Sequence, residues 1–350
     1  MSELALDDWL FHAGSMNNFA RIAQDPEWIV HRFDASSNRF QFVHAPLSTI
    51  QAQTFLADLK PLSVDHSIWV DAAELGRHEF PTVPVHFIFH TAFCRSTLLV
   101  SALNIPSASF GLSEPGVLND LARAGICTPE LIKPVLKLLA RPLAGAKTIV
   151  IKPSNVANNL ISPLLQANEN SRGILLSGSL SEFLHSVNKK GLGGRTWVRR
   201  LYRYVGRYAP LDLGLQGDAE IELTDLQVAA LAWFLQQRHF AILLRSPVRD
   251  RLATVDSTDL LDDREQTLSS VSRFFDLHVD KERISEVANG IVFRNHAKLG
   301  GNYREVLARQ SESARSSIID EEIEIIGRWV EAIVNQTGLS LPVRKPLERD

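Results

Sequence analysis

The stretch VHFIFHTAFCRSTLL, residues 85–99, decides the fold that we expect for this chain. Val85–Phe89 is a short apolar run without polar alternation, which is typical of a buried strand. Ser96–Leu103 has the pattern of a helix. A strand, a tight loop and a helix that opens with Ser96 and Thr97 can bind a phosphate, because backbone N–H groups at a helix start favour an anion. An ordinary strand-to-helix turn with Ser96 as N-cap is the alternative.

The same rhythm of strand, loop and helix continues beyond this stretch. We expect further strands at residues 148–151, 173–176 and 240–244, and helices at residues 130–139, 156–166, 180–188 and 226–237. Short apolar strands separated by helices predict an α/β fold of three layers with a central parallel sheet. Ligands bind at the carboxyl ends of the strands in such sheets, so the residues that follow each strand are the candidate site.

The first part of the chain has a different pattern. Arg39–Val43 alternates and predicts a strand, and Ser48–Leu59 predicts a helix with Ser48 as its N-cap. Pro81 and Pro84 then interrupt the chain. We therefore expect a small N-terminal α+β extension over residues 1–80 and one large domain over residues 81–350.

Composition excludes several classes of protein. The chain has 350 residues, 45% of them hydrophobic, a net charge of −3 and two cysteines. It is therefore neither disordered nor built on disulfides or a four-thiolate zinc site. The charge gives no reason to expect nucleic acid or a membrane as a partner. An acidic N-terminus and short apolar runs favour a soluble, cytoplasmic protein.

Residues 93–99 resemble the phosphosulfate loop of PAPS-dependent sulfotransferases, whose usual form is R/K-S/C-G-S/T-T-x-L. Cys94, Ser96, Thr97 and Leu99 fit this form, whereas Phe93 stands at the basic position and Arg95 at the glycine. Three later stretches resemble further blocks of the bacterial family in the family's own order. They are residues 110–118 with Ser-Glu-Pro, residues 255–277, and the candidate cofactor loop at 293–304.

The resemblance implies a P-loop-type sulfotransferase that transfers a sulfuryl group from PAPS (3′-phosphoadenosine 5′-phosphosulfate) to a hydroxyl or amine, without a metal. Glu114 would be the base, with His90 as second candidate, and Lys152 or Arg95 would stabilise charge on the bridging oxygen. The implied cofactor-binding residues are Phe93, Cys94, Arg95, Ser96, Thr97, Ser177, Ser186, Arg294, Lys298 and Gly301. The acceptor and the oligomeric state stay open.

Ser177 stands where this family has an arginine that holds the 3′-phosphate, and Arg245 is a second candidate for that role. Lys152 could equally extend to solvent at the sheet edge. Arg195, Arg199, Arg203 and Arg207 form a basic stripe at helical spacing. This stripe is either a wall that attracts an anion or a solvated face.

Metal chemistry has little support in the sequence. His86 and His90 lack a third ligand, and we see no apolar strand that ends directly in an aspartate near the loop. A helix start would lower the pKa of Cys94, although a cysteine at such a place is more often a small residue that fills the loop. Two further functions remain as alternatives, a kinase-like enzyme that uses ATP, and a degenerate P-loop domain that acts as a binding module.

Overall fold

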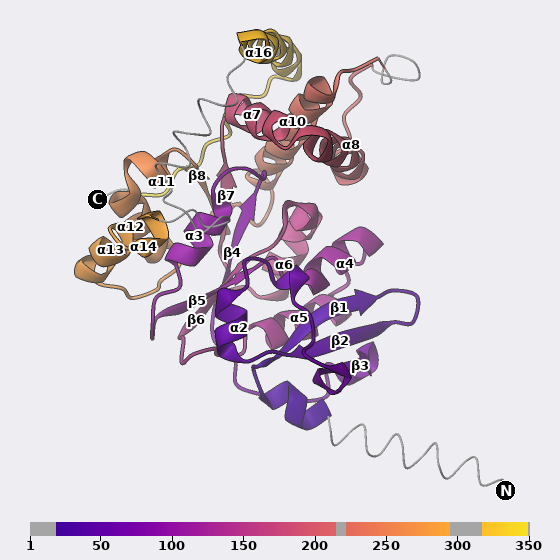
Figure 1. The fold of residues 1–350 in the computed structure, drawn as a ribbon, viewed down its shortest axis with the longest axis vertical. Helices are drawn as coiled ribbons and strands as arrows, with labels where there is room; N and C mark the ends of the chain where they lie inside the picture. Colours follow the sequence, from indigo (N-terminus) through magenta and orange to yellow (C-terminus); the bar gives the residue numbers. More distant parts are fainter. Residues whose placement is uncertain (1–18, 215–221, 295–316, 349–350) are drawn as a thin grey trace, which may run out of the picture.

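The computed structural model describes residues 19–214, 222–294 and 317–348. Its centre is a sheet of five strands in the order β5-β6-β4-β7-β8, and all neighbouring strands in it are parallel (Figure 1). The strands are β4 (Val85–His90), β5 (Ser109–Ser113), β6 (Thr148–Lys152), β7 (Gly173–Ser177) and β8 (Leu252–Asp256). The predicted α/β class with a central parallel sheet is therefore confirmed.

Both faces of this sheet are covered, which explains the unbroken apolar runs in the sequence. On β4, Phe87 and Phe89 join one hydrophobic cluster, while Ile88 between them joins the other. The first face carries α4 (Gly116–Ala124), α5 (Pro129–Leu139) and α6 (Ile161–Ala167), which follows the short helix η4 (Asn155–Leu160). The second carries α3 (Ser96–Ala102), α11 (Asp259–Asp262), α12 (Arg264–Phe274), α13 (Lys281–Ala288) and α14 (Ile291–Arg294).

The strand order creates a switch point between β4 and β7. After β4 the chain passes to β5 on one side of the sheet, and after β7 it passes to β8 on the other. Connections that leave adjacent strands in opposite directions open a crevice at their carboxyl ends, where ligands bind in open α/β sheets. The loop that follows β4 begins at this point.

The N-terminal part forms a separate antiparallel sheet of β1 (Trp28–Asp34), β2 (Arg39–His44) and β3 (Ser67–Asp71). Its buried residues belong to the same hydrophobic cluster as one face of the main sheet. Short 3-10 turns flank β3, namely η2 (Val64–His66) and η3 (Ala72–Glu74). The two sheets share this core, so the domain boundary near residue 80 stays a prediction.

The predicted helix at 48–59 is wrong in length and in its cap. Helix α2 spans Leu47–Ala52, with Pro46 at its N-cap, and a 3-10 turn, η1 (Leu56–Asp58), follows it. The chain turns between the two because Leu56 is buried in the core while the ring of Phe55 lies 5.2 Å from Nζ of Lys152. Tertiary contacts thus override the local helical pattern.

The predicted strand at 240–244 is also wrong, since Phe240 lies within helix α10 (Asp225–Leu243). This helix is buried on nearly all sides, so it lacks the polar face that recurs every three to four residues in an exposed helix. The fifth strand is β8 instead, preceded by the turn η5 (Arg249–Arg251). Over the described part of the chain, no helix is long and apolar enough to cross a membrane.

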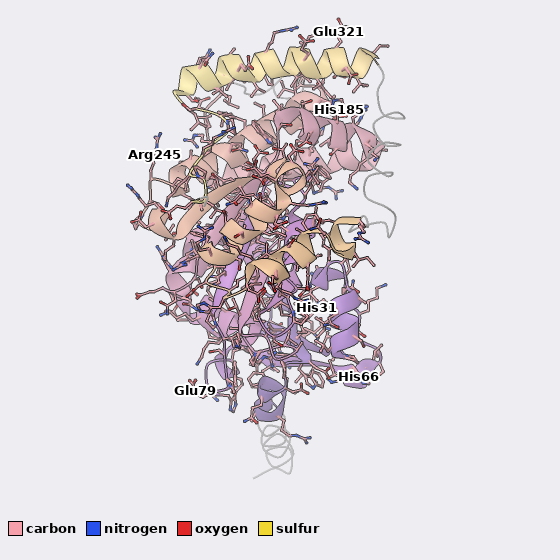
Figure 2. All side chains as sticks on the ribbon, turned by 90° about the vertical axis from the view of Figure 1, so that its left-hand side faces the viewer. His31, His66, Glu79, His185, Arg245 and Glu321 are labelled. Carbon is pink, nitrogen blue, oxygen red and sulfur yellow. The ribbon has the colours of Figure 1, made fainter. Side chains whose placement is uncertain are left out.

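Helices α7 (Leu180–Lys189), α8 (Gly191–Tyr208), α10 and α16 (Ser317–Thr337) gather at one end of the molecule (Figures 1 and 2). They share a third hydrophobic cluster, to which Phe183, Phe234 and Val330 belong. The loop that follows β4 touches this cluster through Ala92 and Phe93. The helical end therefore forms one wall of the region around the switch point.

Candidate functional site

The loop between β4 and α3 has an unusual backbone. Ala92, Phe93 and Arg95 have φ angles of 70°, 52° and 62°, in the left-handed region that non-glycine residues seldom adopt. Such strain persists where the surrounding structure imposes it, often at functional sites. The conformation also explains why a glycine is usual at the position of Arg95.

Helix α3 begins at Ser96, as predicted, but its N-cap is Arg95 and not Ser96. No side chain caps the helix start. The first N–H groups of a helix have no acceptors within the helix, and the helix dipole adds partial positive charge there. Ser96 and Thr97 lie on this first turn and are both buried, 5% and 6% exposed. The arrangement is suited to an anion.

Glu114 and Lys152 form a close ion pair across two neighbouring strand ends. Nζ of Lys152 lies 2.5 Å from Oε1 of Glu114, and the lysine side chain is only 1% exposed. A second link is the N–H of Glu114, which donates to the carbonyl of Lys152 at 2.7 Å. Burial lowers the pKa of Lys152, and the nearby carboxylate opposes this effect. Lys152 therefore does not extend to solvent at the sheet edge, which removes that alternative.

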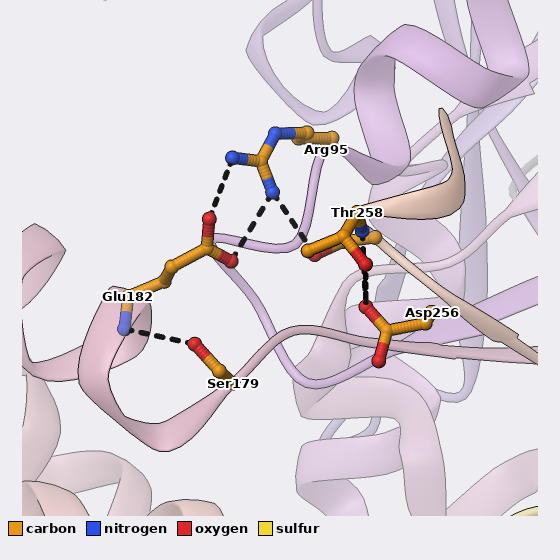
Figure 3. A network of polar contacts seen from close by, with 6 residues as sticks. Arg95, Ser179, Glu182, Asp256 and Thr258 are labelled. Carbon is orange, nitrogen blue, oxygen red and sulfur yellow. Dashed lines mark hydrogen bonds and ion pairs between the residues drawn. The ribbon is translucent and has the colours of Figure 1, made fainter. Parts of the chain in front are cut away.

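Arg95 belongs to a network that joins the ends of β4, β7 and β8 (Figure 3). Its guanidinium donates to both carboxylate oxygens of Glu182, at 3.2 and 2.8 Å, and to Oγ of Ser257 at 3.0 Å. Gly178 packs against the network so closely that a Cβ there would stand 2.9 Å from the Ser257 hydroxyl. The arginine thus fixes the loop to its neighbours.

His90 is held by the backbone at both ring nitrogens. The N–H of Ala92 donates to Nδ1 at 3.0 Å, so Nε2 carries the proton and donates to the carbonyl of Pro153 at 3.1 Å. The residue is 4% exposed. With its lone pair used by Ala92, His90 positions the loop in this conformation, and the geometry does not support it as a base.

Cys94 lies beneath the loop and is fully buried. Its Sγ donates to the carbonyl of Leu176 on β7 at 3.5 Å. Burial raises the pKa of this thiol, so the expectation that the helix start lowers it is wrong. The cost of placing a thiolate in an apolar site exceeds the dipole effect here. The cysteine is a packing residue of the loop.

Phe93 sits in an aromatic group with Phe183 of α7 and Trp197 of α8, at ring distances of 5.6 and 5.3 Å. Nζ of Lys190, between the two helices, lies 5.9 Å from the centre of the Phe93 ring. A lysine from the α7–α8 turn therefore places a positive charge close to the loop. A cation at this distance interacts favourably with the ring face.

Ser177 ends β7 and is buried, and its carbonyl accepts from the N–H of Ser257. Ser186 is half-buried on α7, two turns from the start of that helix. Arg245 instead follows α10 and lies exposed at the periphery of the molecule (Figure 2). The carbonyl of Ser171, just before β7, accepts from the guanidinium of Arg251, just before β8. The segment that joins the C-terminal end of α10 to β8 therefore lies at the amino ends of the strands, opposite the loop. Arg245 is therefore remote from the loop, and the geometry favours Ser177 and Ser186.

The proposed cofactor loop at 293–304 is described only at its start. Phe293 is buried against the cluster of α3, and helix α14, which ends at Arg294, packs on α3. Arg294 is exposed. Lys298 and Gly301 lie outside the described residues. The described start of this segment therefore lies against α3, the helix that follows the candidate loop.

The basic stripe lies on α8, and two of its four arginines have partners. Arg195 donates to Asn188, and Arg199 pairs with Asp225 at 2.6 Å, while Arg203 and Arg207 are exposed. These partners lie on α7 and α10, next to α8 in the helical end. Half of the stripe is consequently structural, and its other half is a solvated face.

Strand β8, which the sequence did not predict, ends in an aspartate, although not next to β4. Asp256 closes β8, but its carboxylate accepts from the N–H and the hydroxyl of Thr258 (Figure 3). Strand β8 is also two strand spacings from β4, roughly 10 Å. Within residues 19–214, 222–294 and 317–348 no group of three histidine, cysteine or acidic side chains could hold a metal ion.

Sequence reasoning missed Glu182, Ser257 and Phe55. Glu182 showed only as the third residue after the helix cap Ser179, to whose hydroxyl its N–H donates. A carboxylate at that position is ordinary at a helix start, so nothing in the sequence marked it as the partner of Arg95. The available signal was Arg95 itself. A charge in a turn beside buried strands needs a partner of opposite charge, which indicates that a carboxylate lies nearby.

Comparisons with known proteins add little. No family model matches the chain, and no match was found among curated proteins. Among solved structures the chain is similar to a sulfotransferase domain from the curacin biosynthetic pathway, at 16% identity and a TM-score of 0.40, over 74% of this chain and 99% of that domain. A likeness at this level supports no inference about chemistry, which rests on the residues at the strand ends.

Proposed function

We propose that this chain is a transferase that moves a sulfuryl group from PAPS to a hydroxyl or amine of an acceptor. The observation that carries the proposal is the meeting of three features at adjacent strand ends. These are the uncapped start of α3 after β4, the carboxylate of Glu114 after β5, and the buried ammonium of Lys152 on β6. An anion site, a base and a cation are what such a transfer needs.

The residues of the loop fit the phosphosulfate end of the donor. N–H groups at the start of α3 have no acceptors in the helix, and the hydroxyls of Ser96 and Thr97 stand on the same turn. The side chain of Arg95 takes no part, since Glu182 and Ser257 hold it. PAPS supplies a sulfuryl group on a good leaving phosphate when it is bound.

Glu114 and Lys152 divide the proton and the charge between them. Glu114 takes the proton that the acceptor loses as its oxygen or nitrogen forms a bond to sulfur. With PAPS bound, the ammonium of Lys152 would stabilise the negative charge that the leaving phosphate keeps when the S–O bond breaks. The glutamate side chain is 21% exposed and the lysine 1%, so the carboxylate is the partner that an acceptor can reach. Before transfer, each group neutralises the other.

The 3′-phosphate end fits this chain less completely, because Ser177 replaces the arginine that is usual there. Ser177 and Ser186 remain the proposed hydroxyl ligands. Lys190, which lies over Phe93, is the cation that we propose for this end. A flexible lysine gives a weaker phosphate contact than a bidentate arginine. We therefore expect modest affinity for the nucleotide.

Calorimetry with PAP (3′-phosphoadenosine 5′-phosphate), the product of the donor, tests the proposal. Wild-type protein should give saturable heat, and Thr97→Val and Lys190→Ala should each weaken binding by about 10-fold, the loss of one charged hydrogen bond. Arg203→Ala is the matched control on the exposed face of α8 and should bind as wild type does. Folded wild-type protein without heat at millimolar PAP would refute the function. Stabilisation by ATP with Mg²⁺ alone would favour the kinase-like alternative.

A further inference from the structure

A polar pocket lies between α2, α3 and β5, and Thr97 at the start of α3 is one of its lining residues. Its walls come from α2 and the segment after it, from α3 and the residue Asn104 after it, and from β5. Its volume of about 130 Å³ is that of roughly four water molecules at ~30 Å³ each. Neither the loop nor the ion pair described above occupies this space, and no role has yet been assigned to it.

The pocket wall consists mainly of hydroxyl and amide groups. They belong to Gln51, Gln53, Thr54, Thr97, Ser101, Asn104 and Ser113. Among the described residues that line the pocket none is acidic or basic. A site with many neutral donors and acceptors recognises a neutral, hydrogen-bonding ligand, because a charged ligand would lose its hydration without gaining a counter-charge.

Ser113 gives independent evidence that something binds there. The residue is 9% exposed, and its Oγ is buried without any hydrogen-bond partner in the described structure. Buried hydroxyls are normally satisfied, so this hydroxyl beside the pocket leaves a hydrogen bond that the described residues do not supply. The hydroxyl both donates and accepts, which suits another hydroxyl.

Chain connections place the pocket beside the proposed chemistry. Thr97, which we assign to the donor, is itself a pocket residue, and Ser113 directly precedes Glu114. Thr54 and Leu56 line the pocket, while Phe55 between them lies against the ammonium of Lys152. A group in the pocket would therefore stand next to Thr97 at the start of α3, while Glu114 and Phe55 belong to chain segments that adjoin the pocket wall.

We infer that this pocket holds part of the acceptor, and that the acceptor carries a small, uncharged polyhydroxyl group such as the edge of a sugar or the end of a polyol. The inference rests on the proposed function, because only a sulfuryl transfer makes the bound molecule an acceptor. A volume of about 130 Å³ takes at most one small ring or chain end, so the remainder of a larger acceptor extends outward. The neutral wall excludes phosphorylated and carboxylated groups from this position.

Ligand-observed NMR with methyl β-D-glucopyranoside and with glycerol tests the inference. Both probes should bind in the presence of PAP, and the glucuronide, which differs from the glucoside by a carboxylate, should bind at least 10-fold more weakly. Ser101→Leu fills the pocket from a half-buried helical position and should reduce glucoside affinity at least 10-fold. Ser269→Leu makes the same change at a half-buried position on α12 and should leave it unchanged. Ser113→Ala, which removes only the orphan hydroxyl, should weaken binding by several-fold.

PAP titrations of the same variants separate this inference from the function. PAP binding unchanged in Ser101→Leu, together with loss of the glucoside, supports both. PAP binding without binding of any neutral probe, or equal binding of the glucuronide, overturns the inference and leaves sulfuryl transfer standing. Glucoside binding by a protein that does not bind PAP overturns the function and the acceptor role with it.

Discussion

Replacing Glu114 with glutamine removes the carboxylate that faces a buried ammonium, and its cost can be derived from the burial of the two partners. Lys152 is 1% exposed, so it cannot turn to water when its partner is lost. Breaking a buried pair in this way typically costs about 3–5 kcal/mol. Glutamine keeps one oxygen as an acceptor, so we expect about 3 kcal/mol for Glu114→Gln.

The reverse substitution is milder because the remaining group is not as deeply buried. Lys152→Met leaves Glu114, whose side chain is 21% exposed and can be hydrated. Methionine also keeps an apolar contact with the ring of Phe55. We expect a loss of about 1 kcal/mol for Lys152→Met, and about the same for the double variant. The coupling between the two positions is then about 3 kcal/mol.

Urea unfolding of the two single variants and the double variant, followed by circular dichroism, measures these values. Glu324→Gln is the control, since it breaks an exposed i,i+4 pair with Arg328 and should cost below about 0.5 kcal/mol. In Glu114→Gln the stability should also rise with pH towards the ordinary lysine pKa of about 10.4, because burial holds the folded pKa lower and the unfolded chain binds more protons. Equal costs for Glu114→Gln and Glu324→Gln would refute the reasoning.

Three further predictions concern packing and titration. Burial lowers the pKa of His86 to about 4, and the charge of Arg172 adds to the effect. The neutral imidazole therefore stabilises the fold above pH ~6.5, and up to ~3 kcal/mol of this stability is lost as the pH falls towards 4. His86→Asn should flatten this dependence of the unfolding free energy on pH. Gly178→Ala should cost about 1–3 kcal/mol, since its Cβ would stand 3.3 Å from the Glu182 carboxylate, whereas Gly193→Ala, with open space around it, should stabilise α8. The guanidinium of Arg141, 3% exposed, donates to the carbonyls of Ile22, Ala23, Asp25 and Trp28. Arg141→Lys should therefore lower the melting temperature by several degrees, because a lysine cannot reach all four acceptors; an unchanged melting temperature would contradict this role.

The sequence predicted those parts of the fold whose signals are local. Strands β4, β6 and β7 and helices α3, α5 and α7 lie close to the predicted ranges. In each of them the apolar residues follow the spacing of a single kind of element, strand or helix, and polar or proline residues mark its ends. The predicted helix at 226–237 lies within α10, and the pattern failed only at the end of that helix, where residues 240–244 had been predicted as a strand. It also failed at β5 and β8, whose few apolar residues did not stand out.

The sequence by itself determined that a loop with a helix start follows a buried strand, and that Lys152 lies at a strand end, whereas the strand before Glu114 was not predicted. Only the tertiary structure decided which charges meet. Strand order brings β5 beside β6, so Glu114 pairs with Lys152, and it brings β7 beside β4, so Arg95 meets Glu182, 87 residues away. Side chains that are distant in sequence interact only after the sheet has fixed their separation. The position of each charge at the candidate site therefore depends on the strand order and not on the local pattern.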